Sequence, residues 1–171
     1  ISALLLDGGR TVHSTFNVPI TGRTGPAPLP SSAQSDLGRL IRGNLYAILW
    51  DEAPMTHRHV LESLDLTLRL LRERPDEPFG GVSVIMGGDF RQVLPIVQGG
   101  SAADQIAASI VWSPVFEKFD RFILHENMRV RNCKDSDPER AAELDAWATS
   151  LLQVGDGHAD LLVDPTTYGA A

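Results

Sequence analysis

Two acidic residues, Asp51 and Glu52, directly follow the largely apolar run LYAILW. An aspartate at the end of a strand can hold a magnesium ion through water, and a neighbouring glutamate can polarise the water that attacks a phosphate. Asp-Glu pairs also begin many solvated helices, where the helix dipole favours negative charge. The dipeptide alone therefore leaves a phosphate-hydrolysis site and a solvated helix start both open.

A second group of polar residues follows another short apolar run, VSVIM, in the sequence GGDFRQVLP. Gly87 and Gly88 permit a close approach of the backbone. Arg91 and Gln92 offer hydrogen-bond donors to phosphate oxygens, and Asp89 adds a carboxylate at the same point. This context favours a nucleotide phosphate site over a solvated acidic turn.

These residues need two strands and a connecting helix to bring them together. The runs at 45–50 and 82–86 have the length and apolar character of strands that are buried on both faces of a parallel sheet. Between them, leucine and valine residues recur at three- and four-residue spacing, which predicts an amphipathic helix within 56–74. A β-α-β crossover puts the ends of both strands at one edge of the sheet, so the three carboxylates are expected to line one crevice.

The rest of the chain is predicted to add shorter elements. They are, in order, a loop at 22–35, a helix at 36–42, a helix at 102–109, a strand at 122–124 and a helix at 138–152. Ser35 is the expected N-cap of the first of these helices. The last helix is expected to bury the stripe formed by Leu144, Trp147, Ala148 and Leu151.

Composition narrows the possible functions. Hydrophobic residues make up 43% and charged residues 22% of the chain, as in ordinary globular proteins. The net charge of −7 excludes a polybasic coat, so contact with nucleic acid must be local. The single cysteine, Cys133, excludes an intrachain disulfide and a cysteine-rich zinc site. Apolar runs are far shorter than the ~20 residues of a membrane span, so no membrane partner is expected.

Taken in order, a series of motifs resembles the PIF (petite integration frequency) ATP-dependent DNA helicases of superfamily one, particularly the Helitron-like branch. The motifs are GGRTVHSTF, LYAILWDEAPM, PFGGVSVIMGGDFRQVLP, ASIVWSPVF, LHENMRV and AWATSLLQVGDG. The resemblance implies an α/β fold, with a partial RecA-like P-loop NTPase domain over 1–126, whose parallel sheet is flanked by helices. Residues 127–171 would begin a second, truncated RecA-like domain.

The activity that this resemblance implies is 5′-to-3′ DNA unwinding driven by ATP hydrolysis with Mg²⁺. Single-stranded DNA and forked duplex DNA would be the partners, while protein partners stay unknown. The implied processes are DNA repair, recombination and telomere maintenance, in the nucleus or alternatively the mitochondrion.

The resemblance also implies roles in binding ATP. Asp51 would be the magnesium ligand and Glu52 the catalytic base. Gln92 would sense the γ-phosphate, with Asp89 and Arg91 supporting the same loop.

Further roles concern the second domain and the DNA. Arg129, in the HENMR sequence, would be an arginine finger that neutralises charge on the transferred phosphoryl group. A segment near the N-terminus would contact the DNA backbone and stack near its bases, through Thr11, His13, Ser14 and Phe16.

The chain departs from the family pattern at its phosphate cradle. No G-x-x-x-x-G-K-[ST] sequence occurs in the 171 residues. In this family that loop lies upstream of GGRTVHSTF, and the late motifs lie downstream of residue 171. The chain also begins without Met, so it is expected to be a central fragment that is inactive when isolated.

Other interpretations stay open from the sequence. A transposon-derived remnant could fold or bind partners without turnover. A carboxylate hydrolase that uses no nucleotide would leave GGDFRQVLP and ENMR unexplained. His57 and His59 flank Arg58 at a helix start, where the two rings are expected to point apart, so a solvated cap is favoured over a metal site.

Overall fold

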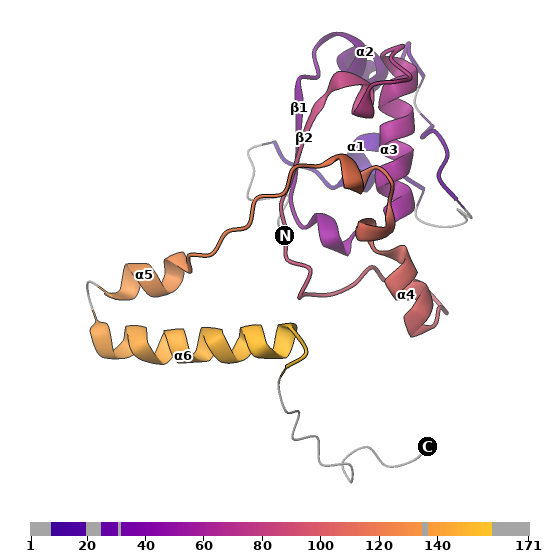
Figure 1. Ribbon diagram of the computed structural model, residues 1–171. Helices are drawn as coiled ribbons and strands as arrows, with labels where there is room; N and C mark the ends of the chain where they lie inside the picture. The colour runs from indigo at the N-terminus through magenta and orange to yellow at the C-terminus, as the bar shows by residue number, and fades with distance from the viewer. Residues whose placement is uncertain (1–7, 20–24, 31, 135–136, 159–171) are drawn as a thin grey trace. The chain divides into compact units, whose positions relative to one another are not determined.

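The computed structural model describes residues 8–19, 25–30, 32–134 and 137–158. The chain forms two compact units, Ile1–Asp120 and Arg121–Ala171, which are described separately below (Figure 1). The division lies N-terminal to the domain boundary after residue 126 that the sequence suggests. Within the described residues, no helix is both long enough and apolar enough to cross a membrane.

A parallel pair of strands forms the centre of the first unit. β1 (Ala47–Trp50) and β2 (Ser83–Met86) pair in the register that sets Trp50 opposite Met86. The parallel pair and its connecting helix confirm the α/β class and the β-α-β unit that the sequence predicts. Both strands begin later than predicted, because the first residues of the apolar runs at 45–50 and 82–86 do not pair in the ladder.

One face of this strand pair is exposed, so the expectation of strands buried on both faces is wrong. Leu49 and Ile85 lie opposite each other and expose 61% and 60% of their surface, whereas Trp50 on the other face is buried. Successive side chains of a strand point to opposite faces. In the part of the chain that the structure describes, the helix that follows β1 covers the face that carries Trp50 and leaves the face of Leu49 and Ile85 open.

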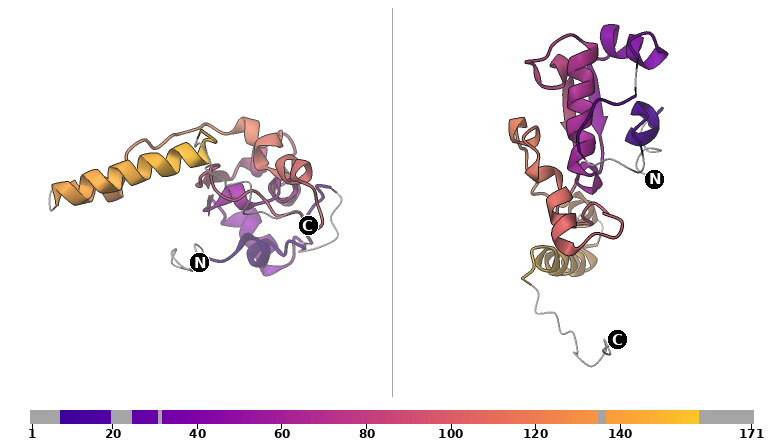
Figure 2. Two further views of the ribbon diagram at one scale, coloured as in Figure 1. Left: turned by 90° about the horizontal axis from the view of Figure 1, so that it is seen from below. Right: turned by 90° about the vertical axis from the view of Figure 1, so that its right-hand side faces the viewer.

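That helix, α3 (Arg58–Leu71), packs its apolar side against the buried face of the strands. The right-hand view of Figure 2 shows it lying along the strand pair. Leu61, Leu64 and Leu68 are fully buried in the same core cluster as Trp50. Each buried leucine contributes about 1.5–3 kcal/mol to stability, so the leucine stripe that predicts this helix also stabilises it.

The remaining elements of the first unit are short. They are α1 (Val12–Phe16), α2 (Asp36–Gly43), η2 (Ala53–Met55), η3 (Pro78–Gly81), α4 (Ala102–Ala108), η4 (Ile110–Trp112) and η5 (Phe116–Lys118). The predicted helices at 36–42 and 102–109 are therefore confirmed, each within one residue.

Polar side chains of α3 fasten the loop before α2. Ser63 Oγ accepts a hydrogen bond from the Ala27 N–H at 3.2 Å, and Thr67 Oγ1 accepts one from the Leu29 N–H at 2.8 Å. Both side chains are buried, so these bonds satisfy groups that would otherwise lose their contact with water. The irregular backbone at 25–30 is thereby held on the helix.

A part-buried ion pair within α3 orients the carboxylate that binds the segment leading into β2. Asp65 bonds Arg69 Nε at 2.8 Å, and its other oxygen accepts from the Phe79 N–H at 2.6 Å. One turn later, Arg72 Nε donates to the Gly80 carbonyl at 2.8 Å. These contacts fix η3 against the helix and so set where β2 begins.

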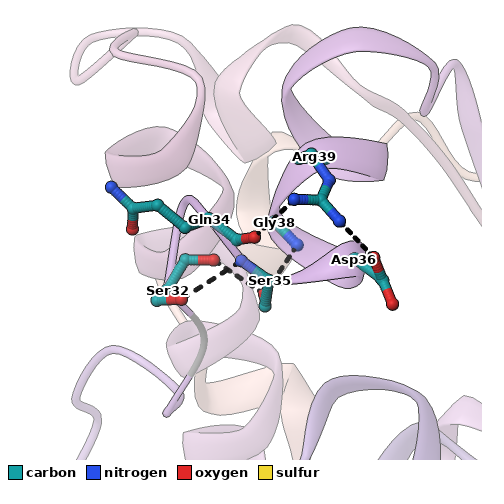
Figure 3. Close-up of polar contacts among 6 residues, drawn as sticks. All are labelled: Ser32, Gln34, Ser35, Asp36, Gly38 and Arg39. Carbon is teal, nitrogen blue, oxygen red and sulfur yellow. Dashed lines mark hydrogen bonds and ion pairs between the residues drawn. The ribbon is translucent and has the colours of Figure 1, made fainter.

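The start of α2 confirms the predicted cap (Figure 3). Ser35 Oγ accepts from the Gly38 N–H at 3.0 Å and donates to the Ser32 carbonyl at 2.7 Å. Arg39 pairs with Asp36 in the first turn. A Cβ on Gly38 would lie 2.0 Å from the Ser32 carbonyl oxygen, so this turn closes only over glycine.

The described part of the second unit contains the helices α5 (Met128–Lys134) and α6 (Pro138–Gly155). Asp137 caps α6 by accepting a hydrogen bond from the Arg140 N–H at 3.1 Å, and proline occupies the first turn. The sequence predicts this start, because proline lacks the N–H that a first turn leaves unpaired.

The stripe predicted to be buried along α6 is largely exposed, which corrects that expectation. Trp147 and Leu151 expose 62% and 51% of their surface, and Leu144 and Ala148 are half-buried. Ala141 is the buried residue of this helix. Within the described part of the second unit, α6 has α5 as its packing partner, and that short helix covers a small part of it.

The strand predicted at 122–124 is also wrong. Residues 121–127 are irregular, and Phe122, Ile123 and Leu124 expose 89%, 74% and 93% of their surface. A strand is stable only when a neighbouring strand pairs with its backbone groups. The described part of the second unit is helical apart from this segment and offers no such neighbour.

Candidate functional site

The two acidic strand ends lie side by side, as the β-α-β pattern predicts. Beyond the ladder, the Gly87 N–H donates to the Trp50 carbonyl at 2.9 Å, and the Ala53 N–H donates to the Gly87 carbonyl at 3.0 Å. We call residues 51–55 the acidic turn and residues 87–95 the second loop. The first bond joins the end of β1 to the start of the second loop, and the second bond joins the acidic turn to the same residue of that loop.

Asp51 presents an exposed carboxylate at this junction. Its Oδ1 accepts a hydrogen bond from the Glu52 N–H at 3.0 Å and lies 3.6 Å from the position that a Cβ of Gly87 would take. Among the described residues, no cluster of three or more His, Cys, Asp or Glu is placed to hold a metal ion. Mg²⁺ is commonly held by one or two carboxylates together with water and substrate phosphates, and an open aspartate of this kind fits it.

Glu52 is half-buried and has an unusual backbone conformation. Its φ and ψ of 53° and 35° lie in the left-handed region, at the residue that precedes η2. This conformation costs about 1–2 kcal/mol for a residue with a Cβ. The hydrogen bonds of Asp51 and Ala53 on either side hold the backbone there.

The second loop is organised around Asp89. Its Oδ1 accepts from the Arg91 N–H at 2.9 Å, and the Arg91 guanidinium lies 4.0 Å from the same oxygen. The Gln92 N–H donates to the Asp89 carbonyl at 3.2 Å. Pro95 is fully buried at the end of the loop, whereas Gln92 is exposed. Asp89, Arg91 and Gln92 thus share one tight turn that begins next to the acidic turn.

A close steric contact between Gly88 and Pro54 also joins these segments. Gly88 has a φ of +151°, and a Cβ built on it would lie 2.3 Å from Pro54 Cδ and 2.8 Å from Pro54 Cγ. The glycine pair in the sequence indicates a close backbone approach. It does not identify Pro54 as the neighbour, because that contact depends on the register of the two strands.

The segment predicted to contact DNA forms α1 and its cap. Thr11 Oγ1 accepts from the Ser14 N–H at 3.2 Å, and Thr11, His13 and Ser14 are exposed. Phe16 is buried, with 6% of its surface exposed, and belongs to the core cluster. The aromatic face expected to stack on bases is therefore packed inside the first unit.

Arg129 lies on α5 and belongs to the second unit, whereas the acidic turn belongs to the first unit. Its side chain is exposed, and its backbone N–H donates to Asn127 Oδ1 at 3.1 Å. Asn127 thereby caps the start of this short helix.

The rings of the two histidines that follow the acidic turn lie against each other at an interplanar angle of 50°, which corrects the expectation that they point apart. The centroids of His57 and His59 are 4.5 Å apart, and His57 Nδ1 caps α3 by accepting from the His59 N–H at 3.1 Å. Burial lowers the pKa of His57 below 6.5, and the nearby His59 and Arg58 lower this pKa further. The negative charge of Glu62 raises the pKa of His57 and so offsets part of this lowering. His57 is thus a cap that works in its neutral form.

Acidification is expected to destabilise the first unit through His57. Because folding lowers this pKa, the unfolded chain binds the proton more readily. Stability present above pH 6.5 is then lost as the pH falls through the lowered pKa. His57→Asn should keep the cap and reduce this pH dependence, whereas His57→Ala should also cost about 1 kcal/mol through loss of the cap. Urea unfolding at several pH values measures both effects, and an unchanged pH dependence in His57→Asn would contradict the assignment.

An apolar hollow of about 450 Å³ lies between α3, α4 and η4. It is lined by Arg58, Ala103, Ile106, Ala107 and Trp112. Two of these lining residues are joined directly, since Arg58 Nη1 donates to the Trp112 carbonyl at 3.1 Å. The sequence gives no signal for this hollow, because its lining comes from three separate elements.

Comparison with known proteins adds to this geometry. The sequence model described as PIF1-like helicase matches residues 1–164. The ATP-dependent DNA helicase PIF4 of Trypanosoma brucei brucei is 35% identical over 105 residues, which cover 60% of this chain and 13% of that protein. The ATP-dependent DNA helicase PIF1 of Danio rerio is 29% identical over 149 residues, covering 85% of this chain and 20% of that protein. The chain thus spans a minor part of these relatives.

Solved structures agree with the sequence comparison. Unliganded Pif1 from Bacteroides sp superposes with a TM-score of 0.54 at 26% identity, covering 79% of this chain and 33% of that protein. Pif1 helicase from Bacteroides in complex with ADP-AlF3 and ssDNA gives a TM-score of 0.52 at 25% identity, covering 75% and 32%. The helicase fold class that the motifs imply is therefore supported by structures as well as by sequence.

Proposed function

Because the chain belongs to the PIF1-like helicase family, we propose that it is the part of an ATP-dependent DNA helicase that binds Mg²⁺ and activates the attacking water. The observation that carries this proposal is the junction at Gly87 in the second loop, which is bonded to the end of β1 at 2.9 Å and to the acidic turn at 3.0 Å. Ligands of open α/β sheets bind at the C-terminal ends of the strands, where this junction lies.

Asp51 is the proposed Mg²⁺ ligand, either directly or through water. Its exposure and its hydrogen bond from the Glu52 N–H support this role, because one carboxylate oxygen is oriented by the backbone and the other stays available. When bound, Mg²⁺ with ATP neutralises charge on the β- and γ-phosphates. Glu52 is proposed to take the proton of the attacking water. In the second loop, Gln92 would donate to the γ-phosphate while Asp89 and Arg91 hold the turn.

Thr11, His13 and Ser14 are proposed to contact the backbone of single-stranded DNA. They are exposed at the start of α1, and hydroxyl and imidazole groups can donate to phosphate oxygens. Phe16 is not expected to contact DNA, because its ring is buried in the core. The expected contacts are sequence-independent, as suits a protein that moves along DNA.

The second unit is proposed to begin the second RecA-like domain and to supply Arg129 as the arginine finger. The exposed guanidinium on a capped helix supports this role. The whole protein would translocate 5′ to 3′ on single-stranded DNA and open forked duplexes. Its proposed processes are DNA repair, recombination and telomere maintenance, in the nucleus with the mitochondrion as the second compartment; these follow from the family alone.

Strand separation by a longer protein that contains this chain and a phosphate-binding loop tests the proposed function. We expect it to open duplexes with a 5′ single-stranded tail in the presence of ATP and Mg²⁺, and to leave duplexes with a 3′ tail closed. EDTA should abolish the reaction, because the phosphates would lose their metal ion. Opening of 3′-tailed duplexes alone would contradict the proposed polarity. A folded protein without ATPase activity would favour a remnant that lacks turnover.

A further inference from the structure

We propose that Gly88 and Pro54 are a positioning pair, which keeps the carboxylates of the acidic turn and the second loop in one fixed arrangement. This inference rests on the proposed function, since it concerns the geometry of ATP hydrolysis. Neither residue carries a group that reacts. Their effect would be steric, because the absence of a side chain at 88 lets the ring of Pro54 lie against the backbone.

The contact is too close for any other residue at position 88. A Cβ there would lie 2.3 Å from Pro54 Cδ and 2.8 Å from Cγ, and 3.5 Å from the Ala53 nitrogen. Non-bonded carbon atoms are in optimal contact at about 3.5–4.0 Å. A methyl group at 88 therefore forces the proline or the second loop to move by roughly 1 Å or more.

Pro54 has little freedom to give way. It is buried in η2, and its ring has no alternative rotamer that would remove Cδ from the contact. The backbone beside it is held by the bond from the Ala53 N–H to the Gly87 carbonyl at 3.0 Å. Strain at this point would therefore pass into the backbone on both sides.

Both sides of the contact carry proposed active-site residues. Glu52 lies two residues before Pro54, in a left-handed conformation that the neighbouring hydrogen bonds maintain. Asp89 follows Gly88 directly and organises the turn that carries Gln92. A displacement at the contact would thus separate the proposed base from the proposed γ-phosphate sensor without removing either group.

The neighbouring glycine shows that this restriction is local. A Cβ on Gly87 would lie 3.6 Å from Asp51 Oδ1, which is an ordinary contact distance. Position 88 is sterically closed and position 87 is not. Gly43, at the end of α2, has no atom within 4 Å of its Cβ position and provides a matched control for exchange of glycine by alanine.

A suppressor experiment in the longer protein tests the pair. Gly88→Ala is expected to lower kcat for ATP hydrolysis by about 10²-fold with a smaller change in KM, since misplacement by 1 Å has costs of this order. Pro54→Ala removes Cγ and Cδ, so the double variant should regain at least roughly tenfold of the lost kcat. The unfavourable φ of alanine at 88 is common to the single and double variants and cancels in this comparison. Gly43→Ala should have normal kcat and KM.

The outcomes separate clearly. A double variant no more active than Gly88→Ala, or a normal kcat for Gly88→Ala, would overturn the positioning role. If Gly88→Ala does not fold, the expected result becomes restored folding in the double variant, measured by thermal unfolding, and its failure also overturns the proposal. Glu52→Gln in the same protein tests the proposed base independently. Normal turnover in this variant would contradict the base assignment, while the comparison of Gly88→Ala with the double variant would still test the positioning pair.

Discussion

Glu52→Gln is expected to lower kcat for ATP hydrolysis by about 10²- to 10⁴-fold in a longer protein that contains this chain and a phosphate-binding loop. The amide keeps the shape of the side chain but cannot accept the proton of the attacking water. Nucleotide affinity should be retained, because the change leaves Asp51 and the phosphate contacts in place. Steady-state hydrolysis and binding of a fluorescent nucleotide measure the two effects separately.

Two further variants show whether the loss is specific to Glu52. Glu73 is exposed in the turn after α3, pairs with Arg42 at 2.7 Å and has a left-handed φ of 57°, so Glu73→Gln is a control at a residue that also has a positive φ. It should hydrolyse ATP normally. Asp51→Asn should instead weaken nucleotide binding that depends on Mg²⁺. Hydrolysis at the normal rate in Glu52→Gln would remove the base assignment.

Arg129→Ala is expected to lower ATP hydrolysis by about 10³-fold, as loss of an arginine finger does in other phosphoryl-transfer enzymes. Binding to single-stranded DNA should be largely kept, because this guanidinium is proposed to face the nucleotide. Arg131 lies on the same helix, is exposed and pairs with Glu126 at 2.9 Å, so Arg131→Ala is the matched control. Equal losses in the two variants would assign the effect to the helix instead of to Arg129.

Joint replacement of Thr11 and His13 by alanine should affect DNA binding and ATP hydrolysis in the opposite way to Arg129→Ala. It should weaken single-strand binding and make that binding less dependent on salt, because fewer counterions are released. Hydrolysis without DNA should be nearly unaffected. If Arg129→Ala abolished DNA binding while the Thr11/His13 replacement stopped hydrolysis, the proposed positions of the two sites would be reversed.

Much of the first unit can be predicted from sequence because its signals are local and repeated. The leucines of α3 recur at helical spacing, and a helix between the two apolar runs supplies the crossover connection that parallel pairing requires. Those two facts suffice to bring the ends of the two strands together, and Asp51 Oδ1 lies 3.6 Å from the Cβ position of Gly87. Caps at Ser35 and Asp137 are equally local, since each side chain bonds its own helix.

The errors concern features that depend on distant neighbours. Phe122 to Leu124 have the composition of a strand, but a strand needs a partner that local composition cannot supply. Trp147 has the spacing of a buried residue, yet burial depends on what packs against α6. The family resemblance predicts that Phe16 contacts DNA, but its ring packs into the core, because an aromatic ring suits both settings. The contact of Gly88 with Pro54 requires the strand register, which no local pattern contains.

The left-handed backbone at Glu52 creates a conflict between folding and chemistry at one position. Glycine adopts this conformation without the steric cost, which amounts to about 1–2 kcal/mol for other residues. Valine or isoleucine would add strain from the branched Cβ. Stability and turnover therefore make opposite demands on residue 52, and improving the robustness of this chain by sequence optimisation would tend to remove its proposed catalytic base.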